Sequence, residues 1–401
     1  MGLRWPSSNT YSMSSALRSA AGIKRGPIHS TGCEGPSPAH LTQTRLVIGF
    51  APVLVRRAPV WLLVLLVSGA SLGLTPSVAR ARGARNCDVR VRPRVSLSDV
   101  MSRHGPGTTY CLARGTFRVT STIETDNGDR VIGAGRNATF IDGSGLPRTA
   151  EGIFLTDTKT YFADFDISGA PTPQAGSGVY CTDRSNCGKA FSIRGSSLTV
   201  QSIDCHDNGG NCIGGGGSTE VSVDDLDCWN NGNAYSMTSS FVYAACIKRA
   251  AVYAAPGGTT VTNSSIHGNP WVGIWCDHCK NGLFDIESNR FVNNGLAGIE
   301  WEMSGGWTTD DRAVIRNNLF RGNNALAASY SAGMHVSTAN DITISGNTFR
   351  RNVVAGVSII FAPSRNPPQP DARGVVVQSN TMNGDLVGGC DLRGVTCGNN
   401  A

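Results

Sequence analysis

Short runs of alternating apolar and polar residues, separated by bends rich in asparagine, recur through the second half of the chain. The segment 288–303, SNRFVNNGLAGIEWEM, shows one unit clearly, and related copies follow as RNNLFRGNNA and SGNTFRRNVVAGVSI. Alternation with a period of two is typical of a β-strand that buries one face. The pattern therefore predicts short strands joined by bends, with the whole unit repeated along the chain.

Aligning the chain on itself shows that the repeat keeps particular residue types in fixed columns. One asparagine column recurs at intervals of 29, 29 and 33 residues, at Asn289, Asn318, Asn347 and Asn380. An apolar column two positions later holds Cys205, Cys228, Ile266, Phe291, Phe320, Phe349 and Met382. A second asparagine column, three positions after that, holds Asn208, Asn231, Asn269, Asn294, Asn323 and Asn352. A strand column comes next, at Ile213, Ile247, Ile274, Ile299, Met334 and Val357.

Repeats of this kind predict a parallel β-helix, a solenoid in which each coil adds one short strand to each of several parallel sheets. Equivalent residues of successive coils then stack about 4.8 Å apart. An inward asparagine at each bend can bond its neighbours along the stack and satisfy backbone groups that would otherwise be buried unpaired. We therefore interpret both asparagine columns as structural.

Further stretches carry a resemblance to a known family. GPGTTYCLARGTF at 105–117 resembles the first coil of exported right-handed parallel β-helix proteins of the pectate-lyase-like superfold, and GIWCDHC, GIEWEMS and AVIRNN resemble motifs of bacterial members. The resemblance covers residues 87–398 and implies an all-β fold, a single-stranded right-handed parallel β-helix. It leaves the reaction open, because this superfold hosts lyases, hydrolases, epimerases and non-catalytic surface proteins. The segment SLSDVMSRHG, residues 96–105, is expected to cap the first coil.

The first 81 residues are interpreted as an N-terminal extension plus a signal peptide. Arg56 and Arg57 precede the apolar run APVWLLVLLVSGASLGL, and SVARA then supplies small residues for cleavage. We therefore expect residues 82–401 to form a secreted or extracellular β-helix domain, anchored to a membrane only if the leader is not cleaved. We also expect this domain to be a monomer.

The formal net charge of +6 does not indicate a nucleic-acid partner, because the excess lies in the leader. Residues 1–81 contain eight Lys and Arg residues and one acid, which leaves 27 basic and 28 acidic residues for the rest of the chain. A domain with nearly balanced charge offers no basic stripe for a phosphate backbone. We therefore expect no binding of nucleic acid.

Twelve cysteines follow the leader, an even and high number that indicates disulfide bonds in an exported chain. Cys87 with Cys111 and Cys390 with Cys397 would staple the two ends of the solenoid. Four central cysteines can pair either along the chain or between coils, and the sequence does not decide between the two: Cys205, Cys212, Cys228 and Cys246. The stretch CDHC at 276–279 offers too few ligands for a closed zinc site.

Strand alternation predicts which side chains leave the core around the strand column. Residues one and three positions after each inward residue are expected outside. The first of these columns holds Gly214, Lys248, Trp275, Glu300, His335 and Ser358, and the second holds Gly216, Ala250, Asp277, Glu302, Ser337 and Ile360. The residues just before the inward ones are likewise expected outside, where glycines would leave bare backbone for a ligand: Cys212, Cys246, Gly273, Gly298, Gly333 and Gly356.

Asp277 and Glu302 are therefore expected to be lateral neighbours on adjacent coils, with Glu300 between Trp275 and His335 on an open face. Like charges side by side destabilise a sheet, so folding alone does not explain this pair. Two such carboxylates either share a proton, with one pKa raised for acid–base catalysis, or hold a cation such as Ca²⁺.

The other candidates fit the same chemistry. Trp275 would offer an apolar plate to a sugar ring, while His335 and Lys248 would act as a base or polarise a carboxylate. Loop insertions such as SGGWTTDDR and APSRNPPQPDAR are expected to wall a groove over this acidic face. We expect no cofactor other than the Ca²⁺ already considered.

These observations predict an exported carbohydrate-active protein that acts on a polysaccharide as a lyase, an epimerase or a hydrolase. Its catalytic residues would be Asp277, Glu302, Glu300, His335 and Lys248, with Trp275 binding the substrate. The alternative is a non-catalytic glycan-binding or structural cell-surface protein that uses the same groove. Turnover of a glycan distinguishes the two hypotheses.

Overall fold

The computed structural model describes ten stretches of the chain between residues 86 and 401. The predicted leader and the long loop insertions fall almost entirely outside them, so the domain boundary after residue 81, the signal peptide and the groove walls stay predictions. Within the described residues, no helix is long and apolar enough to cross a membrane. The described stretches are 86–172, 187–216, 220–232, 245–252, 258–279, 283–302, 312–324, 332–337, 341–360 and 374–401.

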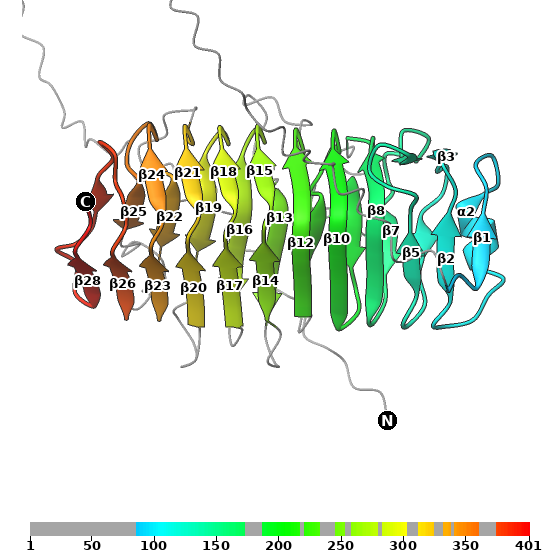
Figure 1. The fold of residues 1–401 in the computed structure, drawn as a ribbon, viewed down its shortest axis with the longest axis horizontal. Helices are drawn as coiled ribbons and strands as arrows, with labels where there is room; N and C mark the ends of the chain where they lie inside the picture. The colour runs from blue at the N-terminus through cyan, green and yellow to red at the C-terminus, as the bar shows by residue number, and fades with distance from the viewer. Residues whose placement is uncertain are drawn as a thin grey trace, which may run out of the picture. The chain divides into compact units, whose positions relative to one another are not determined.

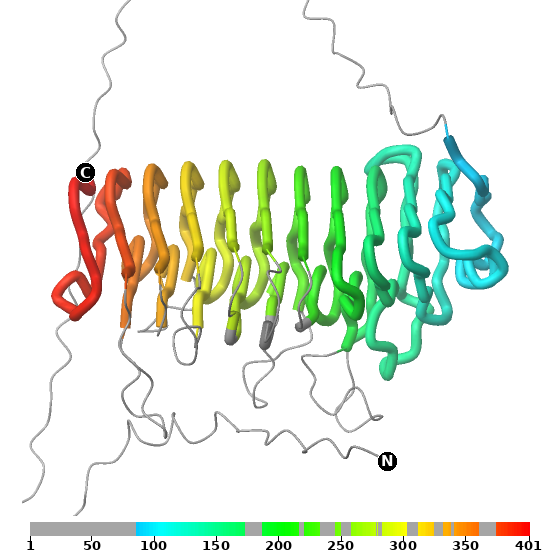
Figure 2. Tube along the Cα trace, turned by 90° about the horizontal axis from the view of Figure 1, so that it is seen from below, coloured from blue at the N-terminus to red at the C-terminus, as the bar shows by residue number. Residues whose placement is uncertain are grey.

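The strands of residues 86–401 stack coil upon coil into two sheets, and every pairing among the described strands is parallel (Figure 1). The trace in Figure 2 shows the same coils stacked in chain order. The ten-stranded sheet contains β4 (Ile123–Glu124), β7 (Gly152–Thr156), β9 (Lys189–Ile193), β11 (Ile213–Gly216), β13 (Ala245–Val252), β16 (Val272–Cys279), β19 (Ala297–Glu302), β22 (Met334–Ser337), β25 (Val357–Ile360) and β27 (Val387–Gly388).

The eighteen-stranded sheet forms the remaining walls of the coils. Three of its strands are long, and in the later coils a pair of shorter strands takes the place of one long strand. It contains β1 (Val89–Val91), β2 (Thr109–Leu112), β3 (Gly115–Arg118), β5 (Arg130–Ile132), β6 (Thr139–Asp142), β8 (Thr160–Ser168), β10 (Ser197–His206), β12 (Glu220–Trp229), β14 (Thr259–Thr262), β15 (Ser265–His267), β17 (Leu283–Glu287), β18 (Arg290–Val292), β20 (Arg312–Arg316), β21 (Leu319–Arg321), β23 (Ile342–Ser345), β24 (Thr348–Arg350), β26 (Val375–Gln378) and β28 (Val395–Gly398).

At the bends of the two asparagine columns, a residue with positive φ comes immediately before the inward asparagine. Asn317 has φ of 56° and precedes Asn318, and Asn293 has φ of 54° and precedes Asn294. Asn, Asp and Gly adopt this left-handed conformation at lower cost than other residues. Seven of the ten column asparagines follow such a residue, and Ser288, Arg351 and Ser379 adopt the same conformation before the other three.

The two asparagine ladders are confirmed. The side-chain amide of Asn289 donates to Oδ1 of Asn318 at 3.0 Å, and the backbone N–H of Asn289 donates to the same oxygen at 2.9 Å. Asn318 and Asn347 repeat this contact one coil further on. Asn294 and Asn323 do the same in the second ladder at 3.0 Å. Each buried amide thus satisfies the backbone of its neighbour, so these residues belong to the scaffold.

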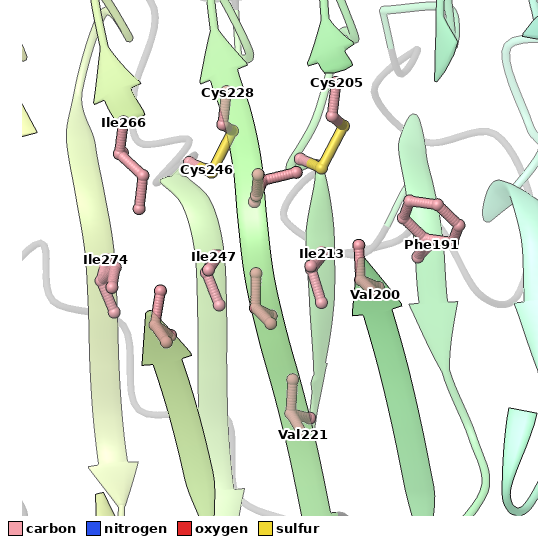
Figure 3. Close-up of a cluster of buried hydrophobic side chains, with 14 of the residues drawn as sticks. Phe191, Val200, Cys205, Ile213, Val221, Cys228, Cys246, Ile247, Ile266 and Ile274 are labelled. Atoms are coloured by element: carbon pink, nitrogen blue, oxygen red, sulfur yellow. A yellow bond between two sulfur atoms is a disulfide. The ribbon is translucent and has the colours of Figure 1, made fainter. Parts of the chain in front are cut away.

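The hydrophobic core lies inside the coils and follows the predicted columns. Phe291, Phe320 and Phe349 stack with ring centroids 4.9 and 4.7 Å apart. The strand column is in register as well, because Ile247 pairs with Ile274 and Ile274 with Ile299. Figure 3 shows this column facing the apolar residues of the other sheet. The apolar columns therefore run unbroken along the solenoid.

The expected cap and end staples are confirmed. Helix α2 (Leu97–Met101) buries Leu97 and Met101 against the first coils, and the Ser96 side chain accepts a hydrogen bond from the Asp99 backbone N–H at 3.2 Å. An acceptor at this place satisfies a donor that the helix start leaves free. Disulfides join Cys87 to Cys111 and Cys390 to Cys397.

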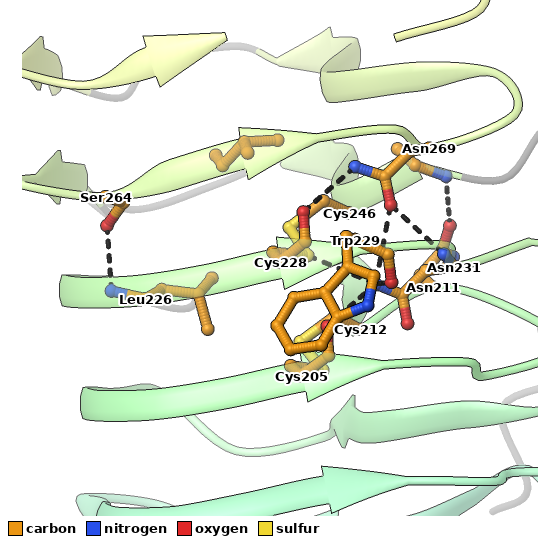
Figure 4. Close-up of a disulfide and its surroundings, with 12 residues drawn as sticks. Cys205, Asn211, Cys212, Leu226, Cys228, Trp229, Asn231, Cys246, Ser264 and Asn269 are labelled. Atoms are coloured by element: carbon orange, nitrogen blue, oxygen red, sulfur yellow. Dashed lines mark hydrogen bonds between the residues drawn. A yellow bond between two sulfur atoms is a disulfide. The ribbon is translucent and has the colours of Figure 1, made fainter. Parts of the chain in front are cut away.

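The central cysteines pair along the chain, as Cys205–Cys212 and Cys228–Cys246, rather than between coils (Figure 4). Cys212 and Cys246 are fully buried, so their expected place on the outer face is wrong. The glycines of the same column also face inward. A Cβ on Gly298 would meet Cδ1 of Phe320 at 2.8 Å. The column thus leaves room for Phe or Ile in some coils and forms a disulfide in others, and it offers no bare backbone to a ligand.

Candidate functional site

Four adjacent strands of the ten-stranded sheet bring all the predicted site residues onto its outer face. β13 contributes Lys248, β16 contributes Trp275 and Asp277, β19 contributes Glu300 and Glu302, and β22 contributes His335. In the register of these strands Lys248 pairs with Trp275, Trp275 with Glu300, and Glu300 with His335. Asp277 pairs with Glu302. We call these six residues the ten-strand site.

Five residues of the ten-strand site are buried, contrary to the expected open face, and Asp277 is half-buried. Trp275 is 2% exposed, His335 3%, Glu302 5% and Glu300 7%. Water is the medium that screens charges, so interactions between these side chains are stronger than they would be on a solvated sheet. Burial of several ionisable groups next to each other is costly, and hydrogen bonds or charge partners must offset that cost.

Lys248 and Trp275 provide part of this compensation. The Lys248 ammonium lies 3.7 Å from Oδ2 of Asp277, and it lies 3.7 Å from the centroid of the Trp275 ring. The indole Nε1–H donates to Oε2 of Glu302 at 3.2 Å. Trp275 therefore links the cation and a carboxylate, with one ring face occupied by the ammonium. Its predicted role as a plate for a sugar ring stays a prediction.

Glu300 is the most unusual group of the site. Within the described part of the chain, its buried Oε2 atom has no hydrogen-bond partner. Burial raises the pKa of Glu300 well above its usual range, the carboxylates of Glu302 and Asp277 raise it further, and Lys248 opposes them. These effects favour the protonated carboxyl group, which makes Glu300 a candidate proton donor.

His335 lies beside Glu300 in the register and is uncharged at neutral pH. Burial lowers the pKa of its imidazole to about 4. A neutral imidazole has one ring nitrogen that can accept a proton. The face thus holds a carboxyl group whose pKa is raised next to an imidazole whose pKa is lowered, and burial favours the uncharged form of both.

The arrangement does not fit a calcium ion. Among the described residues, no group of three or more His, Cys, Asp or Glu side chains is arranged to hold a metal. The Lys248 ammonium lies beside Asp277 and the indole N–H beside Glu302. A cation bound to these carboxylates would meet a positive charge and a hydrogen-bond donor, so these residues do not favour Ca²⁺.

The sequence analysis missed a group that extends this face to an earlier coil. Ser192 of β9 pairs with Gly214 in the outward column. The buried Lys189 ammonium lies 3.3 Å from Oγ of Ser192, and Ser192 donates to Glu151. Burial alone would raise the pKa of Glu151, but hydrogen bonds from Ser192 and Arg194 lower it. The repeat columns in the sequence begin at Cys205, so they gave no prediction for this earlier coil.

A second acidic row lies on the eighteen-stranded sheet, where Asp166, Asp204 and Asp227 pair across β8, β10 and β12. We call these three residues the paired acid row, because each has a positively charged or protonatable partner. Arg136 bonds Asp204 at 3.1 Å. His267 bonds Asp227 at 3.0 Å.

His206 is the partner of Asp166 in this row. Its Nε2 lies 3.0 Å from Asp166, and its Nδ1 lies 2.7 Å from Asp207. Burial alone would lower the pKa of His206, but the two carboxylates raise it to about 9. The imidazole is therefore charged at neutral pH. Its ring stacks on Trp229, with centroids 4.2 Å apart.

Comparison with known proteins supports the architecture. A family model described as "Right handed beta helix region" matches residues 250–400. The A-module of an Azotobacter vinelandii mannuronan C-5 epimerase superimposes with a TM-score of 0.51 at 14% identity, covering 76% of this chain and 88% of that one. A pectate lyase gives a TM-score of 0.44 at 17% identity, covering 79% of each chain.

A DFA-IIIase from Arthrobacter chlorophenolicus A6 gives a TM-score of 0.41 at 14% identity, covering 71% of this chain and 77% of that one. No curated protein matches this chain in sequence. At such low identity the structural likeness concerns the fold and not the reaction. The family model, the parallel sheets and the stacked coils agree: this chain is a right-handed parallel β-helix repeat protein.

Proposed function

We propose that this chain is an exported carbohydrate-active β-helix protein that binds a polysaccharide at the ten-strand site and acts on it as a lyase, an epimerase or a hydrolase. The observation that carries the proposal is the buried carboxyl group of Glu300, whose Oε2 atom has no hydrogen-bond partner in the described part of the chain and which stands next to two further carboxylates. A buried carboxyl group of this kind lowers the stability of the fold, so a role in catalysis explains it better than a structural role.

The three reactions share a requirement that this site meets. Each needs one group that donates a proton to the sugar or its leaving oxygen and another that removes a proton from the sugar or from water. Glu300, whose raised pKa favours the protonated form, is suited to the first task. His335, which is neutral, and the carboxylates of Asp277 and Glu302 are suited to the second.

Lys248 has the charge that such a reaction would use. Its ammonium sits between the Trp275 ring and Asp277. If a substrate carries a carboxylate or develops negative charge during the reaction, a fixed ammonium in a poorly hydrated site stabilises that charge strongly. The likeness in fold to a mannuronan C-5 epimerase supports a glycan as the substrate class.

Export is part of the proposal. Five disulfides among the described residues support an oxidising compartment, including the two that staple the ends. N-terminal sequencing of the secreted protein checks the leader directly. A mature chain that starts near Arg82 is the expected result.

The test of function is a panel of uronate-rich and neutral polysaccharides incubated with the domain. Unsaturated sugars, new reducing ends and exchange of solvent hydrogen into the sugar report lyase, hydrolase and epimerase action, respectively. The folded variants Glu302→Gln and Asp277→Asn should lose at least about 100-fold of the activity of the parent. Variants as active as the parent would refute the site. Binding of a glycan with no product would favour the non-catalytic alternative.

A further inference from the structure

The disulfide Cys276–Cys279 encloses a residue of the ten-strand site. Its two cysteines are three positions apart in β16, and Asp277 and His278 lie between them. Both cysteines are buried, at 0% and 1% exposure. Of the disulfides in the described stretches, this one alone has a predicted site residue inside its loop.

The bond coincides with a sharp change in the course of the strand. Residues three positions apart in an extended strand are about 10 Å from each other. The Cα atoms of Cys276 and Cys279 are 5.6 Å apart, so the chain bends between the two cysteines while Asp277 and Cys279 stay paired with β13. Without a constraint, a strand end of this kind has many alternative paths.

At one end of the disulfide, Cys276 is packed in the core. In the register of the sheet Cys276 lies between Arg249 and Trp301, which are both buried inside the coil. The outer side presents Asp277, whose Oδ2 lies 3.7 Å from the Lys248 ammonium and whose backbone pairs with Glu302. The disulfide therefore connects a rigid core position to a carboxylate of the site.

A purely stabilising role does not explain this bond well. In the loop-entropy account, a disulfide stabilises less as the loop that it closes becomes shorter. Cys276–Cys279 has a sequence separation of 3, against 7 for Cys390–Cys397 and 24 for Cys87–Cys111. Its main effect is therefore on local geometry.

We propose that the Cys276–Cys279 disulfide is a positioning element that fixes the Asp277 carboxylate beside Glu302 and within reach of Lys248. This inference rests on the proposed function of the ten-strand site. Without the bond, the strand end relaxes and Asp277 moves away from its neighbours. The negative charge that helps to keep Glu300 protonated then weakens.

The test compares Cys276→Ala/Cys279→Ala with Cys390→Ala/Cys397→Ala in the full chain. Loss of the first disulfide should lower kcat about 10-fold or more with little change in KM, and it should move the alkaline limb of the pH profile to lower pH. The control removes a longer loop at the far end of the solenoid. It should lower the melting temperature at least as much and leave the pH profile unchanged.

A second readout needs no activity. Carbon-13 NMR of the Glu300 carboxyl group should show its titration midpoint at lower pH in Cys276→Ala/Cys279→Ala than in the parent. If the parent acts on no glycan but this midpoint moves, the positioning role stands and the proposed function fails. If the midpoint and the pH profile both stay in place, the bond is only a structural staple.

A third variant guards against poor folding. Cys276→Val/Cys279→Ala keeps an apolar side chain in the inward column, where β22 carries Val336 in register with Trp301. This variant should fold with a filled core and still show the shifted midpoint. A folded variant with the parent's midpoint overturns the proposal.

Discussion

Two acidic rows on the same solenoid differ in how their charge is balanced. In the paired acid row, Asp166, Asp204 and Asp227 each contact their own arginine or histidine. In the ten-strand site, the Lys248 ammonium lies 3.7 Å from Asp277 and the Trp275 indole N–H donates to Glu302, while burial and these two carboxylates raise the pKa of Glu300. Both rows result from the in-register stacking of coils, which places like residues side by side.

The difference separates a structural cluster from a candidate site. Partners at hydrogen-bond distance make the paired acid row consistent with folding alone. At the ten-strand site, burial and two neighbouring carboxylates raise the pKa of Glu300, which favours its protonated form. An acidic row is therefore informative about function only when its burial and its partners are known.

The largest expected effect is on turnover. Glu300→Gln removes the proton donor, so activity on the glycan that the panel identifies should fall by about 10²–10⁴-fold. Asp204→Asn in the paired acid row should leave activity within about 2-fold, because surface changes away from a site have little effect. Steady-state kinetics of the two folded variants measure this. Equal losses of activity in the two variants would show that the two rows do not differ in function.

The next effect is on stability and concerns His206. The pKa of His206 is about 9 in the folded protein and 6.5 in a model peptide, so the folded state binds the proton more tightly. Its contribution is complete below pH 6.5 and is lost as the pH rises through 9. His206→Gln should lower the free energy of unfolding by about 1.5 kcal/mol at pH 6.

Urea unfolding at pH 6, 7.5 and 9.5 measures this dependence. The loss caused by His206→Gln should shrink steadily and be nearly gone at pH 9.5. His267→Gln is the matched control, because His267 has a single carboxylate contact and a side chain that is 39% exposed. If His206→Gln lowers the free energy of unfolding equally at all three pH values, the charge of His206 does not stabilise the paired acid row.

A smaller effect of opposite sign is expected at the ten-strand site. The raised pKa of Glu300 means that the folded chain holds this proton to higher pH than the unfolded chain, which releases it above about pH 4.5. Stability is therefore lost as the pH rises, and Glu300→Gln should gain about 1 kcal/mol at pH 7.

The gain should fade as the pH drops below 4.5, where both states are protonated. Thermal or urea unfolding at pH 4 and pH 7 gives the comparison, with Glu220→Gln at an exposed position of β12 as the neutral control. A destabilised Glu300→Gln protein at pH 7 would mean that Glu300 is ionised and well paired.

The smallest effect is expected for Asp204 of the paired acid row. Asp204→Asn loses the Arg136 contact but also relieves repulsion from Asp166 and Asp227. The net loss should be about 0.5 kcal/mol, and it should decrease in 1 M salt. Chemical denaturation at low and high ionic strength checks it. A clear gain in stability would show that this row is not balanced by its partners.

The sequence predicted the repeat, the columns and the register of the site, because a period of two and inward asparagines leave little freedom in a parallel stack. Asp277 beside Glu302 and Glu300 beside His335 follow from that register alone. The same reasoning predicted the cap at 96–105 and both end disulfides. These features depend on local pattern and on stacking.

The direction of the glycine column was not predictable in this way. The pairing of β16 with β19 passes from Val272–Ala297 to Ile274–Ile299 and leaves Gly273 out, so strict alternation fails at the turn of the coil. A Cβ on Gly273 would meet Ile266 at 3.0 Å, inside the core. Side-chain direction at a bend depends on backbone angles that apolar periodicity does not encode.

The burial of the ten-strand site and the contacts of Lys248 and Trp275 could not be predicted from the sequence either. Alternation indicates which face a side chain occupies but not what covers that face. The ammonium over the indole ring results from two neighbouring coils and has no signature within either strand. The sequence indicated only that CDHC has too few ligands for a zinc site, and it did not predict the disulfide around Asp277.

The most direct test of the account is the protonation state of Glu300 in the folded protein. Carbon-13 NMR of glutamate side-chain carboxyl groups, assigned by comparison with Glu300→Gln, reports it across the pH range without any substrate. The account predicts a Glu300 carboxyl group that is still protonated at pH 7. A Glu300 signal that titrates near 4.5, like that of an exposed glutamate, would contradict the claim that this face is built for proton transfer.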